Sequence, residues 1–150
     1  GYYRMITPLE AMQEEGRGEG KLIERLPTHV ELARYQPDSL IVQRRYSESF
    51  QEWMGQVRAI SQTYRVFELD DYLINLPLKN HHRKDFTADT NRLLRKTLRF
   101  FDHFVVSTSP LAEALADMHS NIRGVNNRLP VAWWGSLHSL RNQGRKPRIG

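Results

Sequence analysis

Residues able to do chemistry follow short apolar segments, where the chain changes from strand-like to loop-like composition. Asp70 and Asp71 follow the strand-like segment 66–69, and Arg44 follows the apolar segment 40–42. Adjacent carboxylates repel each other, which could raise the pKa of one aspartate toward the range useful for a general base. Arg44 could bind a phosphate or an acidic sugar with two parallel hydrogen bonds. A structural arrangement would use the same residues, with the aspartates capping a loop and pairing with the arginine.

Three other groups of polar residues are candidate binding positions. His81 and His82 lie in a polar loop, where they could contact a substrate or relay a proton, although a solvated loop needs no such role. Ser107 lies where a strand-like segment turns into a helix, so it could help to bind an anion or simply cap the helix. Asn126 and Asn127 follow the last apolar segment and suit either a ligand site or a tight turn. The chain has no cysteine and no histidines at the spacing of zinc ligands, so we expect no metal site.

The elements that must position these residues alternate between amphipathic helices and short apolar strands. Three capping-box patterns, beginning at residues 7, 28 and 49, predict helix starts. In the helix that starts at residue 49, Trp53, Val57 and Ile60 recur at helical spacing and are expected to face a sheet. The predicted helices cover about residues 3–15, 28–36, 49–64, 85–102 and 109–118, and the predicted strands cover 21–26, 40–42, 65–69, 104–106 and 122–125.

This alternation of strands and helices is typical of right-handed βαβ units. Strands that are apolar throughout indicate a parallel sheet covered on both faces. The predicted fold class is therefore α/β, a doubly wound, Rossmann-like parallel sheet with helices on both faces. Such domains usually open with a strand that becomes the centre of the sheet, and here no strand precedes the first helix. We therefore expect the first strand to be missing. Its absence should leave the strands 40–42 and 66–69 either unpaired along an edge or paired with each other, and should favour self-association.

The size and charge of the chain limit the classes of protein to which it can belong. Its 150 residues and 17.6 kDa suit one domain, and its hydrophobic content of 39% excludes a disordered chain. The net charge of +5 and the pI near 9.7 indicate an anionic partner, which a basic nucleic-acid-binding module would explain. No apolar run reaches the roughly 20 residues of a membrane span, so we expect a cytoplasmic protein. A basic stripe on the helix 85–102 could bind phosphates, although most such stripes are solvated; it comprises Arg92, Arg95, Lys96 and Arg99.

Short motifs spread over nearly the whole chain stand in the order known from one enzyme family. They are residues 1–4 (GYYR) with 8–11 (PLEA), 42–44 (VQR), 66–71 (VFELDD) leading to 75–77 (NLP), 105–108 (VVST) with 110–112 (PLA), and 125–130 (VNNRLP). Together they resemble the N-terminal domain of bacterial glycosyltransferases with the GT-B fold. These nucleotide-sugar-dependent enzymes act in the biosynthesis of O-antigen and capsule polysaccharides.

The resemblance implies that residues 1–147 form the acceptor-side, Rossmann-like domain and that residues 148–150 begin the connection to a donor-binding domain. That second domain would bind most of the nucleotide sugar, so no cofactor is expected here and the chain alone is expected to be inactive. The expected partner is a glycan or lipid-linked sugar acceptor in the cytoplasm or at the inner face of the membrane, joined in the full-length enzyme by the nucleotide sugar.

The resemblance also implies roles for individual residues. Asp70 or Asp71 would accept a proton from the acceptor hydroxyl, Arg44 would contact the acceptor or a phosphate, and Asn126 would border the space between the two domains. No specific nucleic acid is expected as a partner in this interpretation. The alternatives are the basic nucleic-acid-binding module and a non-catalytic assembly domain.

Overall fold

The computed structural model describes residues 2–72, 88–128, 131, 135 and 136. The described chain begins with a π-helical turn that continues directly into a first α-helix. The elements, in chain order, are η1 (Tyr2–Ile6), α1 (Thr7–Glu14), α2 (His29–Tyr35), β1 (Ser39–Gln43), α3 (Glu48–Ile60), β2 (Tyr64–Leu69), α4 (Ala88–Leu98), β3 (His103–Val106), α5 (Ser109–Ala114) and β4 (Ile122–Gly124). Among the described helices, none has the length and apolar character needed to cross a membrane.

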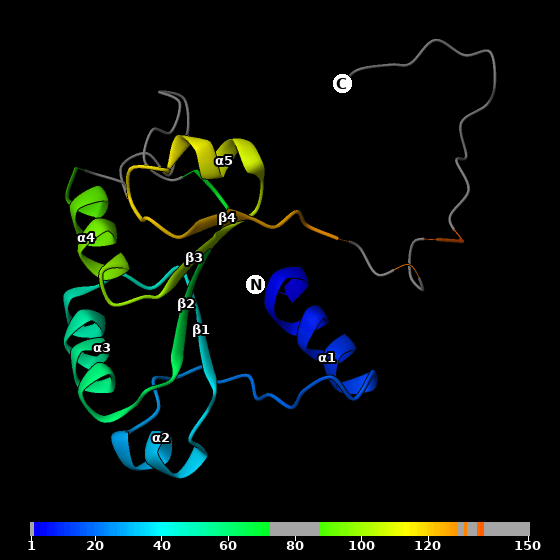
Figure 1. Cartoon of the computed structure of the whole chain (residues 1–150), viewed down its shortest axis with the longest axis horizontal. Helices are drawn as coiled ribbons and strands as arrows, with labels where there is room; N and C mark the ends of the chain where they lie inside the picture. The colour runs from blue at the N-terminus through cyan, green and yellow to red at the C-terminus, as the bar shows by residue number, and fades with distance from the viewer. Residues whose placement is uncertain (1, 73–87, 129–130, 132–134, 137–150) are drawn as a thin grey trace.

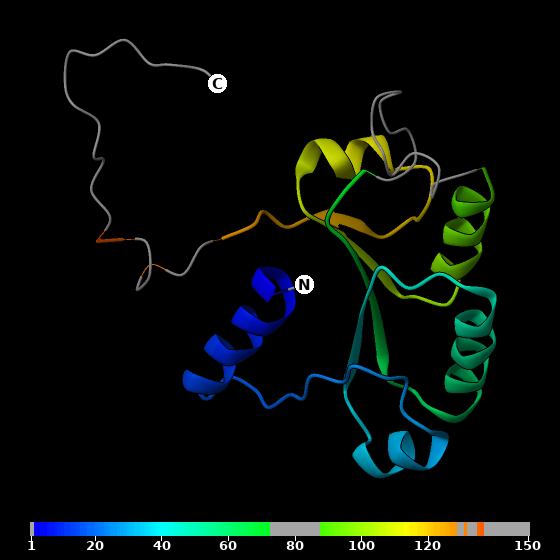
Figure 2. The ribbon, with the colours of Figure 1, turned by 180° about the vertical axis from the view of Figure 1, so that it is seen from behind.

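The described strands form one parallel sheet in the order β1-β2-β3-β4 (Figure 1). Across this sheet, Ile41 of β1 lies beside Val66 of β2, which in turn lies beside His103 of β3. Helices α3 and α4 lie on one side of the sheet and α1 lies on the other, as Figures 1 and 2 show from opposite directions. The α/β class with a Rossmann-like parallel sheet flanked by helices is thereby confirmed.

Each described strand pairs with its neighbour in the sequence, and this decides which edges are free. Of the two outcomes expected for the strands 40–42 and 66–69, pairing with each other is the one observed, and β2 pairs with β3 on its other side. Strand β1 lies at one end of the described sheet, so its other side has no strand partner among the described residues. The two edges of the sheet are therefore β1 and β4.

The hydrophobic core lies between the sheet and the helices α3, α4 and α5. Strand side chains alternate between faces, so Phe67 of β2 and Phe104 of β3 point to this side and are fully buried. Met54 of α3 and Leu98 of α4 meet them there, also without exposed surface. The same alternation places Glu68 on the opposite side, where η1 and α1 lie.

Helix α3 is shorter than predicted, because it ends at Ile60 and not near residue 64, and its rotation also differs slightly from the prediction. Val57 is fully buried as predicted, whereas Ile60 is 54% exposed, so the expectation that Ile60 faces the sheet is wrong. Phe50, Met54 and Val57 lie on the buried face of the helix. At helical spacing the next position on this face is residue 61 and not residue 60, and the helix ends at Ile60. Trp53 packs against the edge of the core, and its Nε1 donates a hydrogen bond to Pro27 O at 2.9 Å.

Two predicted helix starts and one predicted strand are also wrong. The first helix needs no cap at Thr7, because the π-helical turn continues into it and its N-cap residue is Ile6. Helix α3 is capped two residues earlier than predicted, by Ser47, whose Oγ accepts a hydrogen bond from Phe50 N at 3.2 Å. Residues 21–26 belong to no strand among the described residues; this segment contributes the half-buried Leu26 to the core instead.

Helix α2 begins with the capping box that the sequence predicted at residue 28. Thr28 Oγ1 accepts a hydrogen bond from Glu31 N at 3.2 Å, and the Glu31 carboxylate accepts one from Thr28 N at 2.8 Å. The Arg25 guanidinium donates to the same carboxylate. Hydrogen bonds from Arg25, and then from Thr28, lower the pKa of Glu31 from 4.5 to about 2.

We expect an NMR titration of the side-chain carboxyl carbons to give Glu31 a pKa of about 2, and Arg25→Gln to raise this value toward 4.5. Because the folded-state pKa is lowered, the contact stabilises the fold above a pH of about 4.5, and this contribution is lost as the pH falls through about 2. The control Arg17→Gln, at a distant exposed ion pair, should leave the Glu31 titration unchanged. A Glu31 pKa of 4.5 in the unmodified chain would contradict the prediction.

Candidate functional site

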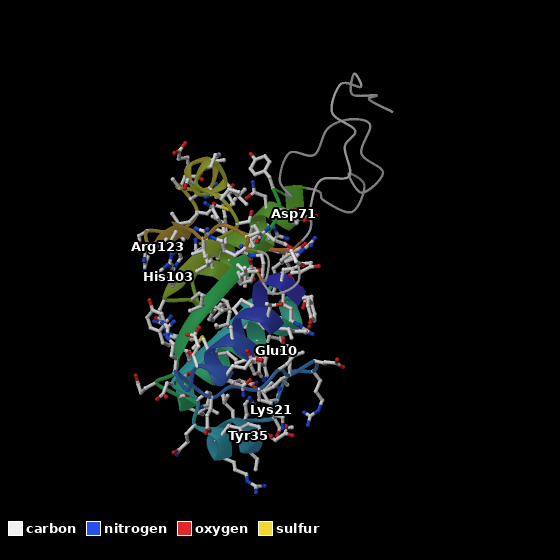
Figure 3. All side chains as sticks on the ribbon, turned by 90° about the vertical axis from the view of Figure 1, so that its right-hand side faces the viewer. Glu10, Lys21, Tyr35, Asp71, His103 and Arg123 are labelled. Carbon is white, nitrogen blue, oxygen red and sulfur yellow. The ribbon has the colours of Figure 1, made fainter. Side chains whose placement is uncertain are left out.

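The carboxyl ends of parallel strands meet at one edge of a sheet, which is where α/β proteins place ligands. In this chain polar side chains from several elements gather at that edge. Figure 3 shows Asp71 there, far from Lys21 and Tyr35 near the other end of the molecule. We call this group the strand-end cluster, and it comprises Arg4, Gln43, Arg44, Glu68, Asp70, Asp71, Ser107 and Asn127.

A buried ion pair forms the base of the strand-end cluster. Arg4 Nε donates to Glu68 Oε1, and the two side chains are only 8% and 4% exposed. The second oxygen of Glu68 accepts a hydrogen bond from Gln43 Nε2 at 2.5 Å. Burial of a carboxylate is costly unless its oxygens are paired, and here both have partners.

Arg4 also holds the segment that follows β4. Its Nη1 donates to Val125 O at 2.8 Å and to Asn127 Oδ1 at 2.7 Å. A planar guanidinium with several donors can make such contacts together with the ion pair to Glu68. One side chain therefore joins the N-terminal turn, the internal strand β2 and the end of the sheet, although these partners lie 64, 121 and 123 positions away in the sequence.

Arg44 occupies the end of β1 in an unusual backbone conformation. Its φ of 54° lies in the left-handed region, which costs a non-glycine residue roughly 1 kcal/mol or more and is found often at functional sites. Its N–H donates to Glu68 O at 3.2 Å, which continues the pairing of β1 with β2. Its Nη1 lies 3.5 Å from Asp70 Oδ1 and 3.6 Å from Asp71 Oδ2. The structural alternative, an ion pair of the arginine with the aspartates, is thus the arrangement observed.

The two aspartates differ in their surroundings. Asp70 has a side chain that is 25% exposed, and Ser107 Oγ donates to its backbone oxygen at 2.6 Å. Its Oδ1 is buried and has no hydrogen-bond partner, with only the long ionic contact to Arg44. Asp71 is 65% exposed, so it presents a carboxylate to solvent beside an arginine. Of the two, Asp71 is the better placed to meet a ligand, and Asp70 is the better placed to shape the loop.

The structure brings together most of the residues that the sequence predicted, apart from the histidines. Arg44, Asp70, Asp71, Ser107 and Asn127 belong to the strand-end cluster. Asn126 is exposed immediately beside it, and His81 and His82 lie outside the described residues. The hydroxyl of Ser107 is used within the protein, and the cap of α5 is Thr108, whose Oγ1 accepts from Leu111 N at 3.2 Å.

Sequence reasoning missed three members of the cluster. Arg4 and Gln43 both lie in motifs of the resemblance, which implies no role for either residue. Glu68 carried the clearest signal, because it is the one acidic residue inside the segment 66–69. A charge in a strand that is internal to a parallel sheet requires a buried partner, and this requirement predicts a cation from elsewhere in the chain.

Two surface hollows of the described residues lie apart from the strand-end cluster. A cavity of about 440 Å³ lies among Gln13, Gly16, Gly18, Glu19 and Gly20, and another of about 340 Å³ lies between residues 21–27 and α2. Both are open hollows on the N-terminal segment, away from the carboxyl ends of the strands. Within the described residues, no three histidine, aspartate or glutamate side chains come together to hold a metal ion. The exposed part of the cluster, formed by Arg44 and Asp71, presents charged groups that suit a polar ligand.

Comparison of the chain with protein-family models, with curated proteins and with solved structures finds no match. Inference of function therefore rests on the strand-end cluster and on the motifs of the sequence.

Proposed function

We propose that this chain is the acceptor-side domain of a nucleotide-sugar-dependent glycosyltransferase that acts in cell-surface polysaccharide assembly. The observation that carries the proposal is the meeting of three separate sequence motifs at one edge of the sheet. Arg4 of the first motif contacts Glu68 of the segment 66–71 and Asn127 of the segment 125–130. A functional edge of the sheet would bring together motifs that stand far apart in the sequence, and here the contacts of one arginine join them.

The exposed part of the strand-end cluster has suitable chemistry for a sugar acceptor. The Asp71 carboxylate can accept a hydrogen bond from a sugar hydroxyl and, next to Asp70, can take up its proton during transfer. Arg44 balances these charges and can receive a phosphate of a lipid-linked acceptor. The nucleotide sugar would be bound mainly by a second domain, which would also stabilise the departing diphosphate. The chain by itself is accordingly expected to transfer no sugar.

The basic stripe on α4 gives weaker support to nucleic-acid binding. Arg92 Nη2 lies 3.3 Å from Asp89 Oδ1, and Arg95 Nη2 lies 2.5 Å from Asp117 Oδ2. Half of the cations in the stripe are therefore already paired with carboxylates of this chain. A surface that binds phosphates of DNA or RNA generally keeps its cations available for them.

The proposal can be tested by NMR titration of the ¹⁵N-labelled chain with three kinds of probe. These are oligosaccharide fragments of bacterial surface polysaccharides, nucleotide sugars, and random-sequence duplex DNA at low and high salt. We expect an oligosaccharide to shift the amide signals of Arg44, Asp71 and Asn126, and Asp71→Asn to weaken its binding by about tenfold, the effect of losing one hydrogen bond to a charged group.

A matched control for Asp71→Asn is Asp89→Asn. Asp89 is 74% exposed and is likewise paired with an arginine, but it lies on α4. This variant should bind the oligosaccharide as the unmodified chain does. Signal changes confined to α4, produced by DNA and abolished by salt, would contradict the proposal and favour the nucleic-acid-binding alternative.

A further inference from the structure

The strand β1 presents a free backbone edge. Tyr64 N donates to Asp38 O at 2.8 Å, and Arg44 N donates to Glu68 O at 3.2 Å, so the even-numbered positions of β1 bond to β2. A parallel strand pair uses every second residue of each strand. The N–H and C=O groups of the alternate residues therefore point away from the sheet, and these residues are Ser39, Ile41 and Gln43. Among the described residues, no backbone group of another segment forms a hydrogen bond with these outward groups.

This edge lacks the features that normally prevent strands from pairing with another chain. Natural edge strands carry a charge, a proline or a bulge, or they are very short. Residues 39–43 have the sequence SLIVQ, without charge or proline, and the central Ile41 is 50% exposed. The opposite edge, β4, has three residues with the exposed Arg123 at its centre (Figure 3). Of the two edges, β1 is therefore the one open to strand addition.

We propose that β1 pairs antiparallel with β1 of a second copy of this chain, about a two-fold axis at Ile41. In this register Ile41 lies opposite Ile41 of the second copy, and Ser39 lies opposite Gln43. In an antiparallel ladder, each residue of a hydrogen-bonded pair directs its N–H and C=O groups at the other strand. This register needs such groups at positions 39, 41 and 43, and these are the positions at which β1 has them. The pairing would join the two sheets into one continuous sheet and remove both free β1 edges.

Charge complementarity supports a second copy as the occupant. One residue beyond this ladder at each end, where the backbone of Arg44 leaves the extended conformation, Asp38 comes near Arg44 of the second copy, whose guanidinium also makes the long contacts to Asp70 and Asp71. Asp38 is exposed and forms no ion pair among the described residues. Opposite charges facing each other across an antiparallel pair stabilise it, and here the symmetry supplies the pair twice. A shifted register would no longer place Asp38 near Arg44 of the second copy, and it would place Ile41 opposite a different residue.

A competing occupant is the segment 21–26 of the same chain. Arg45 Nη2 donates to Glu24 O at 2.8 Å, so this segment passes near the end of β1. It carries Leu22 and Ile23, which are 49% and 38% exposed. Addition of this segment to β1 would close the edge within one molecule and would leave the chain monomeric.

Light scattering of the purified chain at a series of micromolar concentrations should show a mass rising from 17.6 kDa to about twice that value. Ile41→Lys places two lysines against each other on the axis, and it should raise the dissociation constant by more than about tenfold. The matched control is Ile60→Lys, at an isoleucine that is 54% exposed on α3, and it should dimerise normally. Circular dichroism verifies that both variants are folded.

Cysteine cross-linking tests the register without relying on a destabilising variant. The chain has no cysteine, so an introduced one reports on its own contacts alone. Ile41→Cys should form a disulfide-linked dimer on mild oxidation, because the two Cα atoms on the axis would lie about 5.5 Å apart. Ser39→Cys mixed with Gln43→Cys should cross-link as well, whereas Ile60→Cys should not. A chain that stays at 17.6 kDa, or an Ile41→Cys variant that cross-links no better than Ile60→Cys, would overturn the proposal.

Discussion

Replacement of Arg4 with glutamine is expected to lower the free energy of unfolding by about 3 to 5 kcal/mol. The Glu68 side chain is 4% exposed, and without Arg4 its carboxylate would keep only the hydrogen bond from Gln43. The loss of a partner leaves a buried charge uncompensated, which costs far more than the pair itself contributes. Urea denaturation measures this change, and a loss below about 1 kcal/mol would show that Glu68 does not depend on Arg4.

Three further variants separate the sources of this effect. Arg17→Gln removes an arginine from an ion pair whose side chains are 72% and 61% exposed, so it should change stability by less than about 0.5 kcal/mol. Arg4→Met combined with Glu68→Leu removes both charges and should recover much of the loss. Arg4→Lys keeps the charge but cannot reproduce the planar contacts, so it should fall between these results. In Arg4→Gln and Arg4→Lys, ¹⁵N relaxation should show greater mobility of Val125 and Asn127, whose contacts to Arg4 are lost.

Phe67→Ala is expected to lower the free energy of unfolding by about 3 to 5 kcal/mol. Phe67 is fully buried, and its ring contacts the rings of Phe101 at 5.2 Å and Phe104 at 5.9 Å between centroids. Truncation would leave a cavity between β2, β3 and the turn after α4, because a core held by several elements collapses only partially. Chemical denaturation should rank Phe67→Ala as more damaging than Phe67→Leu.

A matched comparison for Phe67→Ala is Tyr64→Ala on the same strand. Tyr64 is 46% exposed on the opposite face of β2, and its main polar contact is a 3.3 Å approach to His103 Nδ1. Its loss should cost well under half as much as the loss of Phe67. Equal costs for the two variants would mean that the core does not lie on the side of the sheet covered by α3 and α4.

Much of the fold could be predicted from local patterns. Apolar segments of strand length and intervening helical periodicity specify βαβ units, so the strands around 40–42, 65–69, 104–106 and 122–125 and their parallel pairing were predicted. The segment 21–26 has the same local composition as a strand. A segment forms a strand only where another strand pairs with it in register, and no described strand pairs with the segment 21–26. Local composition does not encode that meeting.

The helix starts illustrate the same limit on a smaller scale. Thr28 with Glu31 formed the predicted capping box because the contact is completed within four residues. Residue 49 carries an equally good pattern, but Ser47 is the residue that caps α3, because the packing of Phe50 and Met54 in the core sets where the helix enters. Where two caps are chemically equivalent, the tertiary contacts choose between them.

The sequence by itself determined the α/β class and the carboxyl ends of the strands as the place for Arg44, Asp70, Asp71, Ser107 and the asparagines at 126 and 127, because strand and helix periodicities are local properties. Only the tertiary structure decided that Arg4 pairs with Glu68 across 64 residues, that Arg44 faces both aspartates, and that β1 is left as a free edge. These features depend on which strand becomes the neighbour of which, and on which side chain lies close enough to neutralise a buried charge. The neighbouring strands and the partner of the buried charge are both set when the whole chain folds around its core. A short segment of sequence therefore does not specify them.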